Sequence, residues 1–338
     1  MKTVTMRDIA KAAGVSLTTV SRVISGTGYV AEDKRKAVMA AADELGYEFA
    51  RSPHAFPDKK LIGVFSKELS PSPLNSFSLL RDLLSHAAYQ KGFDTISFLL
   101  EHVDNQSLLA SISQAKNYHL SGLIILGFVE EHPSPELAEL FRCLDIPIVF
   151  VERAKGCYDY NRILVDNVRG LYLATRHLLA RGHKKLLYVS RQVIGGGVEE
   201  ERLRGYKMAI EDEPGQAAEG LVFYIPRSAD GRYISEGYQA AEWMLTKHPD
   251  ITAILNWSDG LAAGELQYLT KKGIRVPDDV EIIGYDDTIA QLLAPPLSSV
   301  QMPYAEMAEA AIQCIQEQRI STDYFARSVT LSPRLNIR

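Results

Sequence analysis

The stretch DIAKAAGVSLTTVSRV, from Asp8 to Val23, indicates two short helices joined by a tight turn. Small apolar residues recur at helical spacing up to Gly14, which ends the first helix because glycine readily accepts a positive φ. Ser16 follows in the position of an N-cap for a second helix, which is expected from Leu17 to Ile24. The pattern is that of a helix-turn-helix, the fold that places its second helix in the major groove of DNA.

The second helix is expected to have one apolar face and one polar face. Val20 points into the core, whereas Arg22 lies on the outer face, where its guanidinium can bond two atoms of a guanine. The short hydroxyl side chains nearby suit contacts with phosphate groups. A generic three-helix bundle is the alternative to DNA binding. The residues expected to contact DNA here are Thr5, Ser16, Leu17, Thr18, Thr19, Ser21, Arg22 and Ser25.

A third helix and a linker complete the N-terminal part of the chain. The helix is expected from about Glu32 to Leu45, with Val38 and Ala41 in the core. The segment EFARSPHAFPDKK, residues 48–60, has two prolines and several charges, as linkers do. The expected division is a headpiece at 1–48, a linker at 49–59 and a body at 60–338.

Charge is distributed unevenly along the 338 residues. The net charge is −5, but residues 1–36 hold seven basic side chains against three acidic ones, a net of +4, so the remainder carries −9. A small cationic segment on an acidic body suits a protein that touches a polyanion at one end only. Hydrophobic residues make up 46% of the chain, enough for a sizeable core.

Several functional classes find no support in the sequence. The cysteines, Cys143, Cys157 and Cys314, lack Cys-x-x-Cys spacing, so neither disulfides nor a zinc site is expected. The eight histidines show no ligand spacing, and no phosphate-binding loop is present, so we expect no metal, no cofactor and no enzyme. The N-terminus has no apolar secretory segment and no stretch is long enough to span a membrane, so we expect a cytoplasmic protein.

From Lys60 onward, short apolar runs alternate with amphipathic stretches of helix length, which predicts an α/β body of doubly wound parallel sheets. About nine such strands are too many for one small lobe, so two lobes are expected, with a boundary near residues 153–161 and a second crossing near Pro296–Pro303. The runs are LIGVF, TISFLL, LIIL, IPIVFV, RILV, KLLYV, LVFYI, ITAIL and VEIIGY. The first lobe is expected at about 60–155 and 288–303, and the second at about 156–287 and 304–338.

Polar residues follow several of these strands, at the edge where doubly wound sheets bind their ligands. Carboxylates accept hydrogen bonds from sugar hydroxyls, an arginine donates them, and aromatic rings cover apolar sugar faces. The effector-binding candidates are Glu152, Arg202, Asp259, Asp286 and Trp257, with Tyr233 and Tyr285 as further rings. The structural alternatives are a helix cap at Asp259, a turn at Asp286 or Asp287, and surface charges at Glu152 and Arg202.

The segment from Asp8 to Tyr47 resembles, without gaps, the DNA-binding headpiece of the LacI/GalR family of transcriptional regulators. The resemblance implies a three-helix headpiece joined to a two-lobed body that is similar to periplasmic binding proteins. It also implies a homodimer on a pseudo-palindromic, double-stranded operator. The family's DNA contacts correspond to Leu17, Thr18, Arg22 and Tyr29.

In the body, the resemblance is weaker and extends to about Leu335. ERLRGY, WSDGLAAG and GYDD match the family's effector contacts at Arg202, Asp259 and Asp286, and GCYDYNRILVDN resembles the galactoside-responsive subset. The resemblance also implies interface residues at Leu292 and Leu293, just before the double proline.

The linker departs from the family pattern. The family continues after Gly46-Tyr47 with a hinge helix that inserts a leucine into the minor groove, but here Pro57 disfavours helix at Phe56. Phe56 is expected either to act as an apolar wedge on DNA or to belong to an ordinary flexible linker.

Together these features predict a repressor of sugar-utilisation genes, whose operator affinity is switched by a small neutral sugar held between the lobes. A neutral sugar is expected because three acids against one arginine would repel an anion. The alternatives are a transport-type sugar-binding protein and a sugar-modifying enzyme with a DNA-binding domain.

Overall fold

The structure is a computed structural model, and by its internal contacts the chain divides into two compact units, Met1–Lys59 and Lys60–Arg338. The structure describes residues 5–25, 30–45, 60–67, 76–153, 156–192, 197–214, 218–225, 233–321 and 324–338. The predicted DNA contacts Tyr29 and Phe56 lie outside these residues, and the side chain of Ser25 is also not described.

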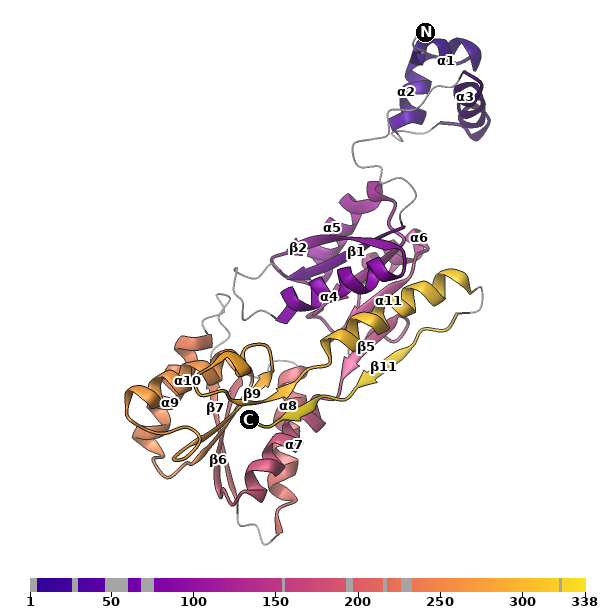
Figure 1. Cartoon of the computed structure of the whole chain (residues 1–338). Coiled ribbons are helices and arrows are strands. Elements are labelled where there is room, and N and C mark those ends of the chain that lie inside the picture. Colours follow the sequence, from indigo (N-terminus) through magenta and orange to yellow (C-terminus); the bar gives the residue numbers. More distant parts are fainter. Residues whose placement is uncertain are drawn as a thin grey trace. The chain divides into compact units, whose positions relative to one another are not determined.

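The described part of the first unit contains the three predicted helices (Figure 1), namely α1 (Met6–Ala12), α2 (Leu17–Ser25) and α3 (Glu32–Glu44). Gly14 has a φ of +64°, as the tight turn requires, and Ser16 Oγ accepts a hydrogen bond from the Thr19 amide at 3.1 Å, which caps α2. Val20 is fully buried, as predicted, and packs in a small core with residues of α1 and α3. The three helices therefore share one core, and the opposite face of α2 is exposed to solvent.

Within the described residues of the body, the first sheet has six strands in the order β11-β5-β4-β3-β1-β2, and its neighbouring strands are all parallel. Its strands are β1 (Lys60–Lys67), β2 (Phe93–Leu100), β3 (Gly122–Leu126), β4 (Ile148–Val151), β5 (Asn161–Val165) and β11 (Ser328–Leu331). The helices of this lobe are α4 (Ser76–Gln90), α5 (Asn105–Ala115), the 3-10 helix η1 (Lys116–Tyr118), α6 (Pro135–Leu144) and α11 (Tyr304–Ile320).

The second sheet also has six strands in the described residues, in the order β12-β10-β9-β8-β6-β7, and is parallel except for the antiparallel pair of β10 with β12. Its strands are β6 (Lys185–Arg191), β7 (Glu219–Ile225), β8 (Ala253–Asn256), β9 (Glu281–Asp286), β10 (Ser298–Gln301) and β12 (Arg334–Asn336). Its helices are α7 (Asn167–Ala180), α8 (Val198–Glu211), α9 (Tyr233–Lys247), α10 (Asp259–Lys271) and the 3-10 helix η3 (Ala290–Leu292). The predicted doubly wound α/β body is confirmed.

The expected division between the lobes is wrong in three places. Strand β5 belongs to the first sheet, although residues 156–165 were expected in the second lobe. Strand β10 pairs with β9 in the second sheet, although 288–303 were expected in the first lobe. Helix α11 and strand β11 belong to the first lobe, where α11 lies beside α4 (Figure 1), although 304–338 were expected in the second. Apolar runs identify strands, but backbone hydrogen bonds between distant segments decide which sheet each strand joins.

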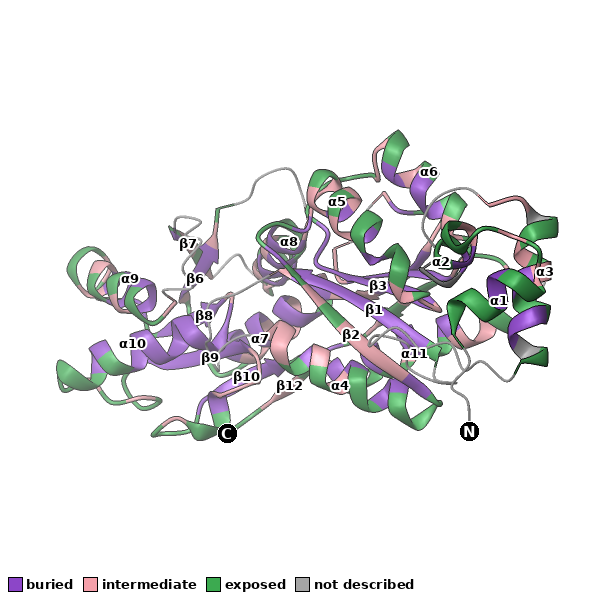
Figure 2. Ribbon diagram, turned by 90° about the horizontal axis from the view of Figure 1, so that it is seen from above, coloured by how far each residue is buried: buried purple, intermediate pink, exposed green. Residues whose placement is uncertain are grey.

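Both lobes bury their sheets, and the central strands are buried along most of their length (Figure 2). One cluster of buried side chains runs from Ile62 in the first sheet through Leu171 and Tyr304 to Tyr285 in the second sheet. Gly205 allows α8 to pack closely on α7, since a Cβ there would lie 2.1 Å from the Val168 carbonyl oxygen. Close packing of α8 against α7 positions the residues of α8 that face the other lobe.

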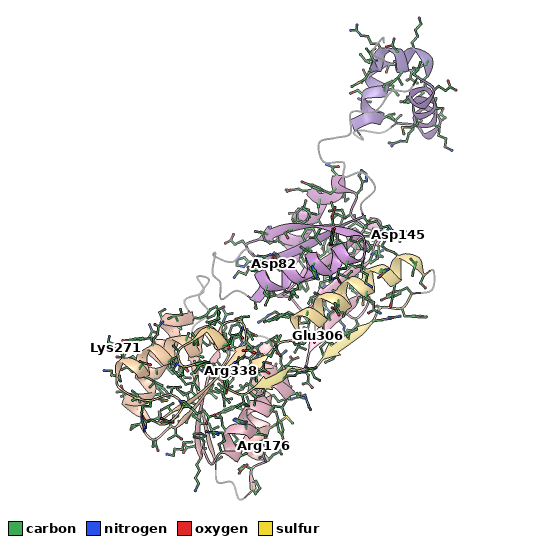
Figure 3. The ribbon with its side chains drawn as sticks, viewed as in Figure 1. Asp82, Asp145, Arg176, Lys271, Glu306 and Arg338 are labelled. Atoms are coloured by element: carbon green, nitrogen blue, oxygen red, sulfur yellow. The ribbon has the colours of Figure 1, made fainter. Side chains whose placement is uncertain are left out.

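The C-terminal residue, Arg338, is hydrogen-bonded to the second lobe. Arg338, labelled in Figure 3, donates from Nη1 to the Leu297 carbonyl at 2.9 Å and from Nη2 to Asp287 Oδ2 at 2.9 Å. Its backbone amide donates to Ser298 Oγ at 3.0 Å. These bonds attach the last residue to β10 and to the turn that follows β9.

Candidate functional site

The free face of α2 and the start of α1 form an open hollow on the headpiece. Leu17, one of the residues that line it, is 44% exposed. The hollow is lined by Thr5, Met6, Arg7, Leu17, Thr18 and Ser21.

The hollow is therefore an open concave surface of about 710 Å³, and not an enclosed pocket. Arg22 and Lys11 are exposed on the same two helices, so that cations flank the polar side chains. The hydroxyls of Ser16 and Thr19 lie 2.8 Å apart and bond each other, which leaves them less available for phosphate than the sequence alone indicated. An open, cationic surface on a short helix suits the major groove of DNA.

In the body, three of the five predicted effector residues lie at the ends of strands, and a fourth, Arg202, reaches them from a helix. Glu152 directly follows β4 of the first lobe, and Trp257 and Asp286 lie at the ends of β8 and β9 of the second. Glu152 and Asp286 have φ values of +72° and +92°, a strained conformation for residues other than glycine that is frequent at functional sites. Arg202 projects from α8 and is only 3% exposed.

Arg202 connects these residues. Its Nη1 donates to the Trp257 carbonyl at 2.6 Å, and its Nε donates to Asn167 Oδ1 at 3.2 Å. Its Nη2 lies 3.7 Å from Asp286 Oδ1, and the guanidinium stacks 3.5 Å from the centre of the Tyr285 ring. Because stacking and hydrogen bonds compensate for lost hydration, a buried guanidinium is stable here.

The two carboxylates of the site are partly shielded from solvent. Burial raises the pKa of Glu152, while the nearby cations Arg153 and Arg202 oppose that rise. Burial also raises the pKa of Asp286 to about 6, opposed by Arg202 and reinforced by the negative charge of Glu152. Since Glu152 and Asp286 come from different lobes, their electrostatic coupling links the lobes through this site.

Aromatic rings and a second arginine extend the site within the second lobe. The rings of Tyr233 and Trp257 lie 5.9 Å apart at 36°, and the Arg191 guanidinium lies 5.0 Å from the centre of the Trp257 ring. Trp257 thus contacts Arg191 as well as Arg202, whose guanidinium is 5.3 Å from the same ring. Flat apolar rings beside hydrogen-bond donors are suited to a polyhydroxylated ligand.

Asp259 does not join this group, and the predicted effector contact there needs correction. It is 1% exposed, and its Oδ2 accepts hydrogen bonds from the amides of Thr288, Ile289 and Ala290 at 2.7, 3.2 and 3.3 Å. Its Oδ1 accepts from Ser299 Oγ at 2.6 Å. With both oxygens engaged inside the second lobe, Asp259 holds the turn after β9, and we remove it from the effector set.

The predicted effector residues did not include several residues that the structure places at the site. Arg153 and Glu199 join the lobes by an ion pair of 2.7 Å, and Glu199 is 1% exposed. Asn167 bonds both Arg202 and the Tyr285 hydroxyl, the latter at 3.2 Å. Arg191 ends the strand KLLYVSR and could have been found by the rule that identified the other strand-end residues. The partners Glu199 and Asn167 carried no such signal.

Another carboxyl is buried on α10 of the second lobe. Glu265 on α10 is fully buried, and burial raises its pKa well above the ordinary value, although Asn256 Nδ2 donates to its Oε2 at 2.8 Å. Glu265 Oε1 and Asn256 Oδ1 are both buried without a hydrogen-bond partner. A proton on Oε1 can join them, so that the neutral acid and the amide form a pair with two hydrogen bonds.

We therefore expect the body to lose stability as the pH rises. A carboxyl with a raised folded-state pKa stabilises the fold fully below its unfolded-state pKa, and this contribution is lost as the pH rises through the folded-state pKa. Asp286 and Asp259, with pKa values of about 6 and about 7, act in the same direction as Glu265. Thermal unfolding at a series of pH values from about 5 to about 8 should show a falling melting temperature.

Glu265→Gln provides the matched variant, because glutamine retains both hydrogen bonds and has no proton to lose. Its stability should depend less on pH than that of the parent, above all at the upper end of the series. Equal pH dependence in the two proteins would show that Glu265 does not titrate in this range.

The described residues contain no group of three or more His, Cys, Asp or Glu side chains placed to hold a metal ion. Among the helices described, none has the length and apolar character that crossing a membrane requires. A helix-turn-helix headpiece and a two-lobed α/β body with polar and aromatic residues at the lobe junction define a DNA-binding regulator that carries a ligand-binding domain.

Comparison with known proteins identifies the family. The family description "Bacterial regulatory proteins, lacI family" matches residues 5–48, and "Periplasmic binding protein-like domain" matches residues 175–338. The HTH-type transcriptional regulator DegA of Bacillus subtilis (strain 168) is 30% identical over 344 residues, covering 100% of this chain and 98% of that protein. The HTH-type transcriptional repressor PurR of Shigella dysenteriae serotype 1 is also 30% identical, with 98% and 95% covered. The chain belongs to the lacI family of bacterial regulatory proteins.

Solved structures of regulators are similar over nearly the whole chain. The transcriptional regulator CelR–cellobiose complex has a TM-score of 0.68 and 25% identity, covering 99% of both chains. The Lac repressor bound to ONPG has a TM-score of 0.68 and 25% identity, covering 99% of this chain and 98% of that one. The chain is therefore a DNA-binding transcriptional regulator with an effector-binding domain, and not an enzyme, as expected.

Proposed function

We propose that this regulator is a repressor whose affinity for its operator is switched by a small sugar bound at the lobe junction. The observation that carries the proposal is Arg202, which is buried, stacked on Tyr285, and placed between Trp257 and Asp286. Glu152 adds an acceptor from the other lobe. Donors, acceptors and aromatic rings in one place suit the hydroxyls and apolar faces of a sugar. The CelR–cellobiose complex, similar in fold, supports a sugar as the ligand.

The galactoside preference implied by GCYDYNRILVDN receives little support from the site. Asn161 in this segment bonds Gln318 through Nδ2 at 2.8 Å and Tyr324 through Oδ1 at 2.8 Å, both within the first lobe. Asn167, the last residue of this segment, accepts a hydrogen bond from Arg202. We therefore propose a sugar without restricting it to galactosides.

A linkage experiment tests this function. An operator is selected from random DNA, and its affinity for the full chain is measured with and without each sugar of a panel. A sugar that changes operator affinity must have its own affinity changed by the operator to the same factor. Such a sugar at 100 times its Kd should also add about 2.7 kcal/mol of stability. If no sugar alters either operator binding or thermal stability, the proposed effector class is wrong.

We also propose that the protein acts as a homodimer on a pseudo-palindromic operator, because one helix-turn-helix unit covers too few base pairs for tight, specific binding. Leu292, at the end of η3, is 76% exposed, which suits an interface residue, whereas Leu293 packs against the core of the second lobe. Sedimentation of the parent and of Leu292→Asp at micromolar concentration would test this, since a monomeric parent would contradict the proposal.

Arg22→Ala is expected to weaken operator binding by about 1–3 kcal/mol and to relax base preference at one position, as the loss of a two-bond contact with guanine does. Arg22 is exposed on α2, on the face opposite the buried Val20. Binding to the selected operator and to its single-base variants is measured at fixed salt concentration.

Lys11→Ala on α1 serves as the control, because it removes one exposed positive charge of the same headpiece without touching α2. It should weaken binding to all sequences by a similar factor and leave the order of preference unchanged. If Arg22→Ala behaves in the same way as Lys11→Ala, Arg22 does not read a base.

A further inference from the structure

Arg191 differs from the other arginines at the lobe junction. Arg153 pairs with Glu199 at 2.7 Å, and Arg202 lies 3.7 Å from Asp286. Arg191 contacts the Trp257 ring instead, and no carboxylate of the described residues forms an ion pair with it. Its Nε is buried and has no hydrogen-bond partner. A buried cationic donor without an acceptor is unfavourable, so a ligand that supplies an acceptor there gains affinity.

The adjacent indole also lacks a hydrogen-bond acceptor. Trp257 Nε1 is also buried without a hydrogen-bond partner, and the Arg191 guanidinium lies 5.0 Å from the centre of that ring. Arginine and tryptophan side chains donate hydrogen bonds and cannot accept them. The missing partner is therefore an acceptor, and a carboxylate has two oxygens that match the fork of a guanidinium and neutralise its charge.

We propose that the effector is an acidic sugar, a uronate or an aldonate, whose carboxylate pairs with Arg191. The hydroxyls of the same ligand then face Arg202, Asp286 and Glu152, and its apolar face lies against the Tyr233–Trp257 pair. This inference rests on the proposed function and names the chemical class of its ligand. It replaces the neutral sugar expected from the sequence, which counted Asp259 as a third acid and Arg202 as the one arginine.

The charge of the site favours a carboxylate over a phosphate. Asp286 and Glu152 lie near Arg202, and Glu199 pairs with Arg153, so three carboxylates belong to the same lobe junction. A ligand group with one negative charge is balanced by Arg191, which has no carboxylate partner among the described residues. A phosphate dianion would bring a second charge that repels these acids.

Calorimetry with matched pairs of sugars tests the inference on the full chain. The pairs are D-galacturonate with D-galactose, D-glucuronate with D-glucose, and D-gluconate with D-glucitol, all at one ionic strength. The acidic member of at least one pair should bind about tenfold more tightly or better than its neutral partner, as expected for a charge-assisted pair of hydrogen bonds.

Arg191→Gln should lose that advantage. Its affinity for the acid should fall by about tenfold, whereas its affinity for the neutral partner should change by less than about twofold, since only the charged contact is removed. Arg204→Gln, on the exposed face of α8, is the control and should bind both as the parent does. Arg191→Lys, which keeps the charge without the planar fork, should recover part of the preference and guards against misfolding of the glutamine variant.

The outcomes separate this inference from the proposed function. If a neutral sugar binds as tightly as its acid, if Arg191→Gln weakens both members equally, or if only a sugar phosphate binds, the inference is overturned and a sugar-switched regulator remains. If no member of any pair binds and operator affinity is unaffected by all of them, both the inference and the sugar effector are overturned.

Discussion

Arg202→Met is expected to destabilise the body by about 3–5 kcal/mol, the usual cost of removing one partner of a buried ion pair. The change leaves the Asp286 carboxylate beside Glu152 without its nearest cation, and it leaves Asn167 Oδ1 and the Trp257 carbonyl without a donor. Methionine retains much of the packing volume, so the loss reports charge and hydrogen bonding. Urea unfolding of the full chain, followed by tryptophan fluorescence, measures the effect.

Two further variants show whether the uncompensated charge is the cause. Asp286→Asn in the Arg202→Met background removes the unpaired carboxylate and should restore part of the stability. Arg204→Met, on the exposed face of the same helix, should change stability by no more than about 0.5 kcal/mol. A loss below about 1 kcal/mol for Arg202→Met would mean that Arg202 is not held as a buried ion pair.

Asp259→Ala is expected to destabilise the second lobe by about 3 kcal/mol or more, because each buried group left unpaired costs about 1–3 kcal/mol. The amides of Thr288, Ile289 and Ala290 and the hydroxyl of Ser299 all lose their acceptor together. This result differs from the loss of effector affinity at constant stability that a direct ligand contact would produce. Unfolding curves and calorimetry on the same preparations distinguish the two.

Asp259→Asn is the matched control. Its Oδ1 can accept from the three amides while its Nδ2 donates to Ser299 Oγ, so the turn keeps its bonds without the charge. It should retain most of the stability that alanine loses and bind effector as the parent does. If asparagine preserves stability but loses effector binding, Asp259 would have to be restored to the effector set.

The headpiece was predictable in detail because its fold depends on neighbours in the sequence. Gly14 adopts the positive φ of the turn, Ser16 caps α2, and Val20 is buried, each as the local pattern indicated. The α/β class of the body was predictable for the same reason, since apolar runs of strand length alternate with amphipathic helices. At the candidate site, the strand-end rule placed Glu152, Trp257 and Asp286 correctly at the lobe junction.

The same rule was wrong at Asp259, because a strand-end carboxylate can turn inward to bond the backbone as readily as it can face a ligand. Its partner Ser299 is 40 positions away, a distance in sequence that no local pattern bridges. Arg191 shows the converse, since only the three-dimensional arrangement reveals that its Nε lacks a partner.

By itself the sequence determined the class of this protein: a DNA-reading headpiece and a doubly wound body, both encoded in periodicity, turn residues and charge over short stretches. Only the tertiary structure decided which strands form each sheet, that α11 returns to the first lobe, and which charged residues face one another. The physical reason is that sheet membership and ion pairing depend on backbone bonds and desolvation between segments far apart in the chain, such as Glu152 and Arg202.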